Sequence, residues 1–283
     1  MPDAEPATLQ ILRVATPPTV SHSATFSATR LDHTILGGDA DPFMSIDHFT
    51  MGAPTFPPHP HAGFSAVTYV LPESAGSMHN RDSRGDSSVI GPGGLHWTAA
   101  GAGIVHEEVP HPAGSVVEGF QIFVKQPVGD EVAPARIYHV DPADIPEAAF
   151  GGGGIERVIA GASGAGQAPF VTPSPLVALD VKLAAGDIYR WSTPWPETAV
   201  AVYVFKGAAV LNGETVAAPS VVLMRRGSGR VVVESGEEGA RLFLMAGEPL
   251  DLPIYTNGPF ALSSREAIQT AVQRYHAGGM GRL

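Results

Sequence analysis

Short apolar runs alternate with turn-forming residues along most of this chain. Runs rich in Val, Ile, Tyr and Phe occur at residues 66–71, 119–124, 176–183, 199–205, 221–224 and 241–245. The 33 Gly and 26 Pro are spread between these runs instead of being gathered in one tract. Short runs of β-branched and aromatic residues bounded by turn residues are typical of strands. The pattern therefore predicts an all-β protein.

A helical pattern occurs only near the end of the sequence. Ser263 is followed three residues later by Glu266, which predicts a capping box. The residues that then share one face at helical spacing are Ala267, Ile268, Ala271, Val272 and Tyr275. Because Gly278 and Gly279 end this run, we expect a short C-terminal helix that packs on a sheet.

The length of 283 residues suits two domains of ordinary size. A glycine-rich segment at 150–167 is the expected connection, although residues 155–160 inside it have the pattern of one more strand. We place the domains at 1–150 and 151–283. A faint repeat supports a duplicated β fold, since 59–71 and 101–108 match the apolar patterns of 193–205 and 227–234. The second copy lacks the histidines of the first.

Charge and composition exclude several classes of protein. The net charge of −11 comes without a basic cluster, which argues against nucleic-acid binding. The N-terminus, MPDAEPATLQ, has no apolar signal region, and no stretch reaches the roughly 18 apolar residues of a membrane span. We therefore expect a soluble cytoplasmic protein. Because there is no Cys, a transition metal would need nitrogen and oxygen ligands.

Most of the possible nitrogen ligands lie in the first half of the chain, because ten of the eleven histidines precede residue 140. His59 and His61 are two residues apart, so in a strand both point to one face. His106 and Glu108 repeat this spacing. Two such strands facing each other across a barrel would present three nitrogens and one carboxylate to a metal ion. This donor set suits Fe(II), Mn(II), Ni(II) or Cu(II). The alternative is a pair of surface histidines.

The motifs around these pairs resemble one known family. Phe56 opens the stretch FPPHPHAGFSAVTYVL, and Gly91 opens GPGGLHWTAAGAGIVHEEVP. Both are similar to sequences of the pirin family. Further matches follow in the family's order, including Asp41-Pro42-Phe43 and the block from Gly258-Pro259-Phe260 to Glu266. The resemblance therefore covers nearly the whole chain.

The resemblance implies a bicupin, with two jelly-roll β barrels face to face and a metal only in the N-terminal barrel. The ligands that it implies are His59, His61, His106 and Glu108. The expected metal is Fe(II), with Mn, Ni, Cu and Zn as alternatives. The chain departs from the family at Ser65, where pirins usually have Glu, and at His96, where Gln is common. His96 is therefore a further candidate ligand, and the alternative is a histidine of the core or surface without a metal.

The resemblance implies two classes of function. Bacterial pirins are associated with quercetin 2,3-dioxygenase activity, in which a flavonol or related enol and dioxygen would be the small-molecule partners. Glu108 would then be the catalytic base that accepts the enol proton. Animal pirins are associated with iron-dependent regulation of a transcription factor, and a non-catalytic redox-sensing protein is the alternative. An isomerase-like or storage cupin is a third reading, because the fold alone does not decide chemistry. The sequence does not identify a protein partner.

Overall fold

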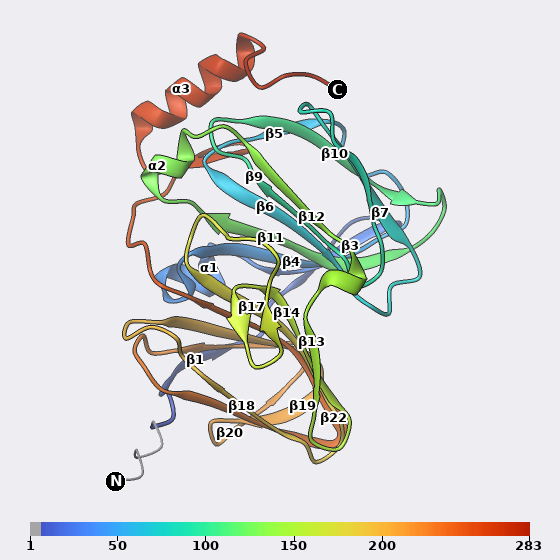
Figure 1. Ribbon diagram of the computed structural model, residues 1–283, viewed down its shortest axis with the longest axis vertical. Coiled ribbons are helices and arrows are strands. Elements are labelled where there is room, and N and C mark those ends of the chain that lie inside the picture. The colour runs from blue at the N-terminus through green and yellow to red at the C-terminus, as the bar shows by residue number, and fades with distance from the viewer. Residues whose placement is uncertain (1–6) are drawn as a thin grey trace. The chain divides into compact units, whose positions relative to one another are not determined.

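The computed structural model describes residues 7–283, and residues 1–6 of the acidic N-terminus lie outside this range. The described chain is mostly β and divides into two compact units, each built from separate segments (Figure 1). Unit 1 contains residues 7–17, 33–42 and 146–249, and unit 2 contains 18–32, 43–145 and 250–283. Strands are thus the main element, as the sequence predicts.

Unit 2 contains a seven-stranded sheet in the order β12-β9-β6-β11-β4-β3-β2 and a four-stranded sheet in the order β5-β10-β7-β8 (Figure 1). The bounds of the strands are β2 Thr19–Ser23, β3 Phe26–Leu31, β4 Phe43–Met51, β5 His59–His61, β6 Phe64–Val70, β7 Ser77–Asp82, β8 Ser87–Ile90, β9 Leu95–Ala99, β10 Ile104–His111, β11 Val117–Lys125 and β12 Arg136–Val140. The helix α2 spans Val128–Glu131, and a 3₁₀ turn spans Pro142–Asp144.

The end of the chain also belongs to unit 2. Strands β23 (Tyr255–Asn257) and β24 (Phe260–Leu262) form a hairpin, which is followed by α3 (Arg265–His276). Ile268 and Ala271 of α3 are buried in a cluster with Phe260 and Leu262. The expectation of a short C-terminal helix that packs on strands is therefore confirmed.

The capping box predicted for this helix is wrong. Ser264, not Ser263, is the N-cap, and its hydroxyl oxygen accepts a hydrogen bond of 3.0 Å from the backbone N–H of Ala267. Ser263 instead donates to a carboxylate oxygen of Glu131 at 2.7 Å. The side chain of Glu131 is buried. Because the Ser263 hydroxyl bonds this distant residue, it does not cap the helix.

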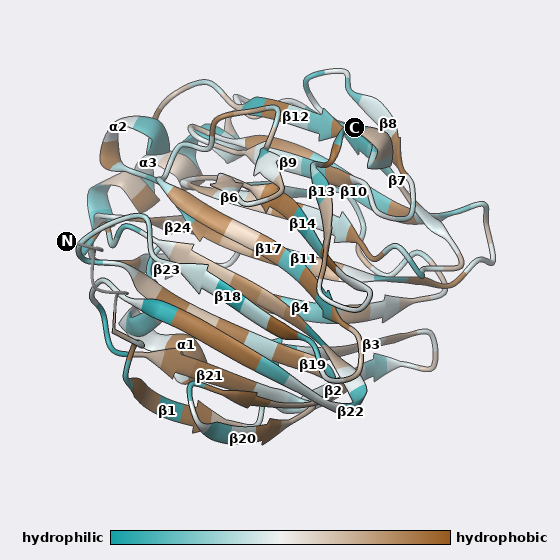
Figure 2. Ribbon diagram, turned by 60° about the horizontal axis from the view of Figure 1, so that its bottom comes forward, coloured by the Kyte–Doolittle hydropathy of each residue, from teal (hydrophilic) through white to brown (hydrophobic). Residues whose placement is uncertain are grey.

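Unit 1 is built on a nine-stranded sheet whose main path is β1-β21-β19-β22-β17-β14-β13. The bounds of its elements are β1 Ile11–Ala15, α1 His33–Leu36, a 3₁₀ turn Gly37–Ala40, β13 Glu147–Phe150, β14 Gly154–Ala160, β15 Ala162–Ser163, β16 Gly166–Gln167, β17 Leu176–Leu183, β18 Ile188–Ser192, β19 Ala199–Leu211, β20 Glu214–Ala217, β21 Ser220–Met224 and β22 Arg230–Gly247. Apolar residues follow β17, β19 and β21 (Figure 2), where the core is rich in Val and Leu.

The units differ from the division 1–150 and 151–283 at both ends of the chain. β1 pairs with β21, with Ile11 opposite Met224, which places the N-terminal strand in unit 1. Residues 250–283 lie in unit 2. The boundary near the middle of the chain lies at residue 146 instead of residue 151. Strand β13 belongs to unit 1, because it forms a hairpin with β14 across the glycine-rich turn. Pairing between strands far apart in sequence leaves no local compositional signal.

Candidate metal centre

Strands β5 and β10 bring three imidazoles together. The strands are antiparallel neighbours, with His106 directly opposite His59 and Ile104 opposite His61. The ring centroids of the three histidines lie 4.7 to 4.8 Å apart, and one nitrogen from each lies within 4.8 Å of the other two. One metal ion could contact all three.

The arrangement of the two strands differs from the expectation. We expected them to face each other across a barrel, but they are hydrogen-bonded neighbours in the four-stranded sheet. Directly opposite residues of an antiparallel pair share a face and lie about 5 Å apart, so His59 and His106 meet through strand pairing. The i, i+2 spacing then adds His61 to the same face.

Burial keeps two of the three imidazoles neutral. It lowers the pKa of His61 to about 3 and that of His106 well below its usual value. His59 Nδ1 lies 2.9 Å from the carbonyl oxygen of Pro57, so Nδ1 donates to that oxygen and Nε2 is the nitrogen available to a metal. The buried Nδ1 of His106 has no hydrogen-bond partner. A neutral imidazole is the form that binds a metal, so these residues fit one.

Glu108 lies beside this cluster but outside the group of three. It is on the same face of β10 as His106, and its Oε2 accepts a hydrogen bond of 2.7 Å from the hydroxyl of Thr68. Burial raises the pKa of Glu108 to about 7, and the Thr68 hydrogen bond opposes that rise. A carboxyl group with this pKa exchanges its proton near neutral pH. Whether Glu108 is a fourth ligand stays a prediction.

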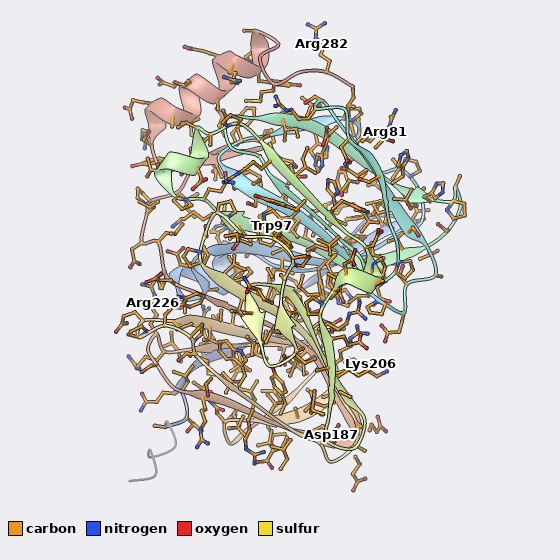
Figure 3. All side chains as sticks on the ribbon, viewed as in Figure 1. Arg81, Trp97, Asp187, Lys206, Arg226 and Arg282 are labelled. Carbon is orange, nitrogen blue, oxygen red and sulfur yellow. The ribbon has the colours of Figure 1, made fainter. Side chains whose placement is uncertain are left out.

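The neighbouring Glu107 points the other way. It forms an ion pair with Arg81 of β7, whose side chain is half exposed and projects from the surface (Figure 3). The alternation of side chains along β10 therefore separates the two glutamates, with Glu108 inside and Glu107 outside.

A cavity of about 230 Å³ opens onto the imidazoles. Its walls are mainly aromatic and thioether side chains, contributed by Phe26, Phe49, Met51, Phe56, Met78 and Phe123. Its polar lining consists of the three histidines, Glu108, Arg30, Asp47 and Gln121. A cavity that combines aromatic walls with converging polar groups is typical of a small-molecule site.

A row of polar residues crosses the seven-stranded sheet beside this cavity. Each member is directly opposite the next on the neighbouring strand, in the order Arg30, Asp47, Gln121, Thr68, His96 and His139. Arg30 forms two hydrogen bonds of 3.0 Å with Asp47. The Thr68 hydroxyl lies 3.0 Å from Gln121 Oε1 and 2.7 Å from Glu108 Oε2, and these two acceptors share its one proton. Sequence analysis missed this row, because its members are adjacent only through strand register.

His96 does not join the three imidazoles. It lies on β9 in a second group, with Asp82 and Asp86. The departure from the family at this position therefore does not add a ligand to the first cluster.

Comparisons with known proteins decide the family. A family model described as Pirin matches residues 24–124, and one described as Pirin C-terminal cupin domain matches residues 178–281. The chain belongs to the pirin family. The resemblance drawn from the two histidine motifs is thereby confirmed, and so are the two cupin domains.

Within the described residues, no helix is long and apolar enough to cross a membrane.

Relatives and solved structures agree with this. The chain is 36% identical over 260 residues to a Pseudomonas aeruginosa protein named "Putative quercetin 2,3-dioxygenase", covering 87% of this chain and 88% of that one. It is 33% identical over 275 residues to a Pirin-like protein of Caulobacter vibrioides, covering 95% and 98%. A crystal structure of quercetin 2,3-dioxygenase from Acinetobacter baumannii is 28% identical with a TM-score of 0.86, covering 97% and 99%.

Proposed function

We propose that this pirin is a mononuclear metal-dependent dioxygenase that cleaves a flavonol such as quercetin, or a related enol. The observation that carries the proposal is the cluster of three imidazoles that lines a cavity with aromatic walls. The similarity to proteins named for quercetin 2,3-dioxygenase activity supports the choice of substrate.

His59, His61 and His106 would hold the metal, with Glu108 as fourth ligand or as base. We propose Fe(II), with Mn, Ni, Cu and Zn as alternatives, because the donors are nitrogen and oxygen. When bound, such an ion would supply Lewis acidity and a template for the enol oxygen and dioxygen.

Glu108 is suited to take the proton of the enol hydroxyl. Its pKa of about 7 lets it accept a proton near neutral pH. The Thr68 hydroxyl lies 2.7 Å from Glu108 Oε2, and Gln121 Oε1 lies 3.0 Å from the same hydroxyl, so the two acceptors share its one proton. The carboxylate is therefore oriented before the substrate arrives.

The cavity walls are suited to a flat aromatic ligand. Phe26 and Phe56 pack edge to face with their centroids 5.2 Å apart, and both line the cavity. Aromatic walls exclude water and favour ring contacts. The paired Arg30 and Asp47 offer polar contacts to ligand hydroxyl groups.

The first experiment measures bound metal in protein expressed without added metal, in wild type and in His59→Ala/His61→Ala. We expect a transition metal in the wild type and its loss from the variant. His79→Ala is the control, because His79 is on the outward face of β7 and bonds Ser87 there. A folded wild type that holds no metal and does not take up Fe(II) would refute the site.

The second experiment tests catalysis. Iron-loaded protein with flavonol and air should consume dioxygen and release carbon monoxide, and Glu108→Gln should lose turnover while keeping most of its metal. Protein that binds iron but consumes no dioxygen would refute the dioxygenase proposal. That result would favour the redox-sensing regulatory function instead.

A further inference from the structure

A second group of metal-ligand side chains lies inside unit 2. Asp82 ends β7, Asp86 follows in the turn to β8, and His96 lies on β9 of the other sheet. One carboxylate oxygen of each aspartate and one imidazole nitrogen lie within 4.8 Å of one another. None of these donors belongs to the three-imidazole cluster.

The two aspartates are held by the turn. Asp82 Oδ1 accepts hydrogen bonds from the backbone N–H groups of Arg84 and Asp86 at 2.7 and 3.1 Å. Asp86 Oδ2 accepts from Asn80 and Ser88 at 3.0 and 2.5 Å. These bonds leave Asp82 Oδ2 buried with no hydrogen-bond partner, on a side chain that is 3% exposed.

One ring nitrogen of His96 is left with a free lone pair. It is 1% exposed, its Nδ1 lies 3.4 Å from His139 Nδ1, and its Nε2 has no hydrogen-bond partner. His139 Nε2 lies 3.6 Å from the carboxylate of Asp141, which favours a proton on that nitrogen. His139 Nδ1 then accepts, His96 Nδ1 donates, and His96 Nε2 is left unprotonated.

The group therefore lacks a positive charge. Among the described residues, neither Asp82 nor Asp86 forms an ion pair with Lys or Arg. Burial raises the pKa of Asp82 and lowers that of His96 to about 4, as expected for donors without a counter-charge. A buried carboxylate oxygen without a partner is costly, and a cation would satisfy all three donors.

We propose that Asp82, Asp86 and His96 form a second divalent-cation site in unit 2, separate from the three-imidazole cluster. Two carboxylates balance the charge of one divalent ion, and an O,O,N donor set suits Mn(II) or Zn(II). The ion joins the β7–β8 turn of the four-stranded sheet to β9 of the seven-stranded sheet. Its role is structural, and it is independent of the proposed dioxygenase function.

The test begins from His59→Ala/His61→Ala, in which the first cluster is removed. Protein is stripped with chelator, equilibrated with Mn(II) or Zn(II), passed through a desalting column, and analysed for metal. We expect two equivalents in wild type, one in the double variant, and none after His96→Gln is added. In the double variant we also expect the metal to raise the melting temperature by about 5 °C, an effect that His96→Gln removes.

His79→Gln, added to the same background, is the matched control and should keep the remaining equivalent. A folded double variant that binds neither metal would overturn the proposal, and this result does not depend on whether His96→Gln folds. Asp86→Asn removes another of the three proposed ligands, and its metal content in the same background is the second measurement that locates the ion. A wild type that holds only one equivalent, which His59→Ala/His61→Ala keeps and His96→Gln removes, would count against the proposed dioxygenase centre and not against the second site.

Discussion

The hydroxyl of Thr68 donates a hydrogen bond of 2.7 Å to the carboxylate of Glu108. The two residues come from different sheets of unit 2, since Thr68 is on β6 and Glu108 on β10. This contact connects the polar row of the seven-stranded sheet to the group proposed as catalytic base.

Replacing Thr68 with Val should therefore impair turnover more than metal binding. Loss of a hydrogen bond to a charged group costs about 1.5–3 kcal/mol, which corresponds to a roughly 10- to 100-fold decrease in kcat. The acidic limb of the pH profile should move to higher pH, because Thr68 lowers the pKa of Glu108. Thr68→Ser keeps the hydroxyl and should have the kcat and the pH profile of the wild type. A pH profile that does not shift in Thr68→Val would contradict the effect of Thr68 on the pKa of Glu108.

The pH dependence of stability should reveal the buried carboxyl in metal-free protein. The pKa of Glu108 is raised from 4.5 to about 7, so the folded state binds this proton more tightly than the unfolded state. The stability that it contributes is present below pH 4.5 and is lost as the pH rises through 7. In urea unfolding, Glu108→Gln should gain stability relative to wild type between pH 5 and pH 8. A constant difference would show that Glu108 has an ordinary pKa.

Two glycines with similar backbone angles offer a matched test of the turn after the His59–His61 strand. Gly63 has φ +86°, and a Cβ there would lie 2.2 Å from the carbonyl oxygen of Ala261. Gly85 has φ +93°, with nothing within 4 Å of an added Cβ. Gly85→Ala should cost about 1–2 kcal/mol of backbone strain, whereas Gly63→Ala adds a clash and should cost about 2–5 kcal/mol.

The metal content of Gly63→Ala should also fall, because Gly63 follows His61 by two residues. Metal analysis together with urea unfolding of both variants checks this. Equal losses of stability in the two variants would show that the contact with Ala261 is unimportant.

The cap of α3 can be tested at Ser264. Ser264→Ala removes the acceptor for the Ala267 N–H and should cost about 1 kcal/mol, with faster hydrogen exchange in the first turn of the helix. Ser264→Asp retains an acceptor and should behave like wild type. If Ser264→Ala leaves exchange unchanged, the assignment of the N-cap would be wrong.

Much of the fold could be predicted because its signals are local. The run at residues 176–183 became β17 with the same bounds, while β19 and β22 extend well beyond the runs at 199–205 and 241–245. The pairing of β1 with β21 and the transfer of residues 250–283 to unit 2 could not be predicted, because they depend on contacts between distant segments.

For the candidate site, local sequence signals identified the candidate donors. The two i, i+2 pairs, the absence of Cys and the family motifs singled out His59, His61, His106 and Glu108. Period-two alternation places each pair on one face of a strand wherever that strand lies. That information is carried by neighbouring residues, so it needs no tertiary structure.

How these candidate donors meet, and what surrounds them, depends on the folded chain. Register placed His106 opposite His59, and the packing of the two sheets of unit 2 brought Thr68 to Glu108 and His96 to Asp82 and Asp86. Burial then determined which imidazoles stay neutral and raised the pKa of the carboxyl group. Register and burial result from pairing and packing between segments far apart in the chain, so no local pattern encodes them.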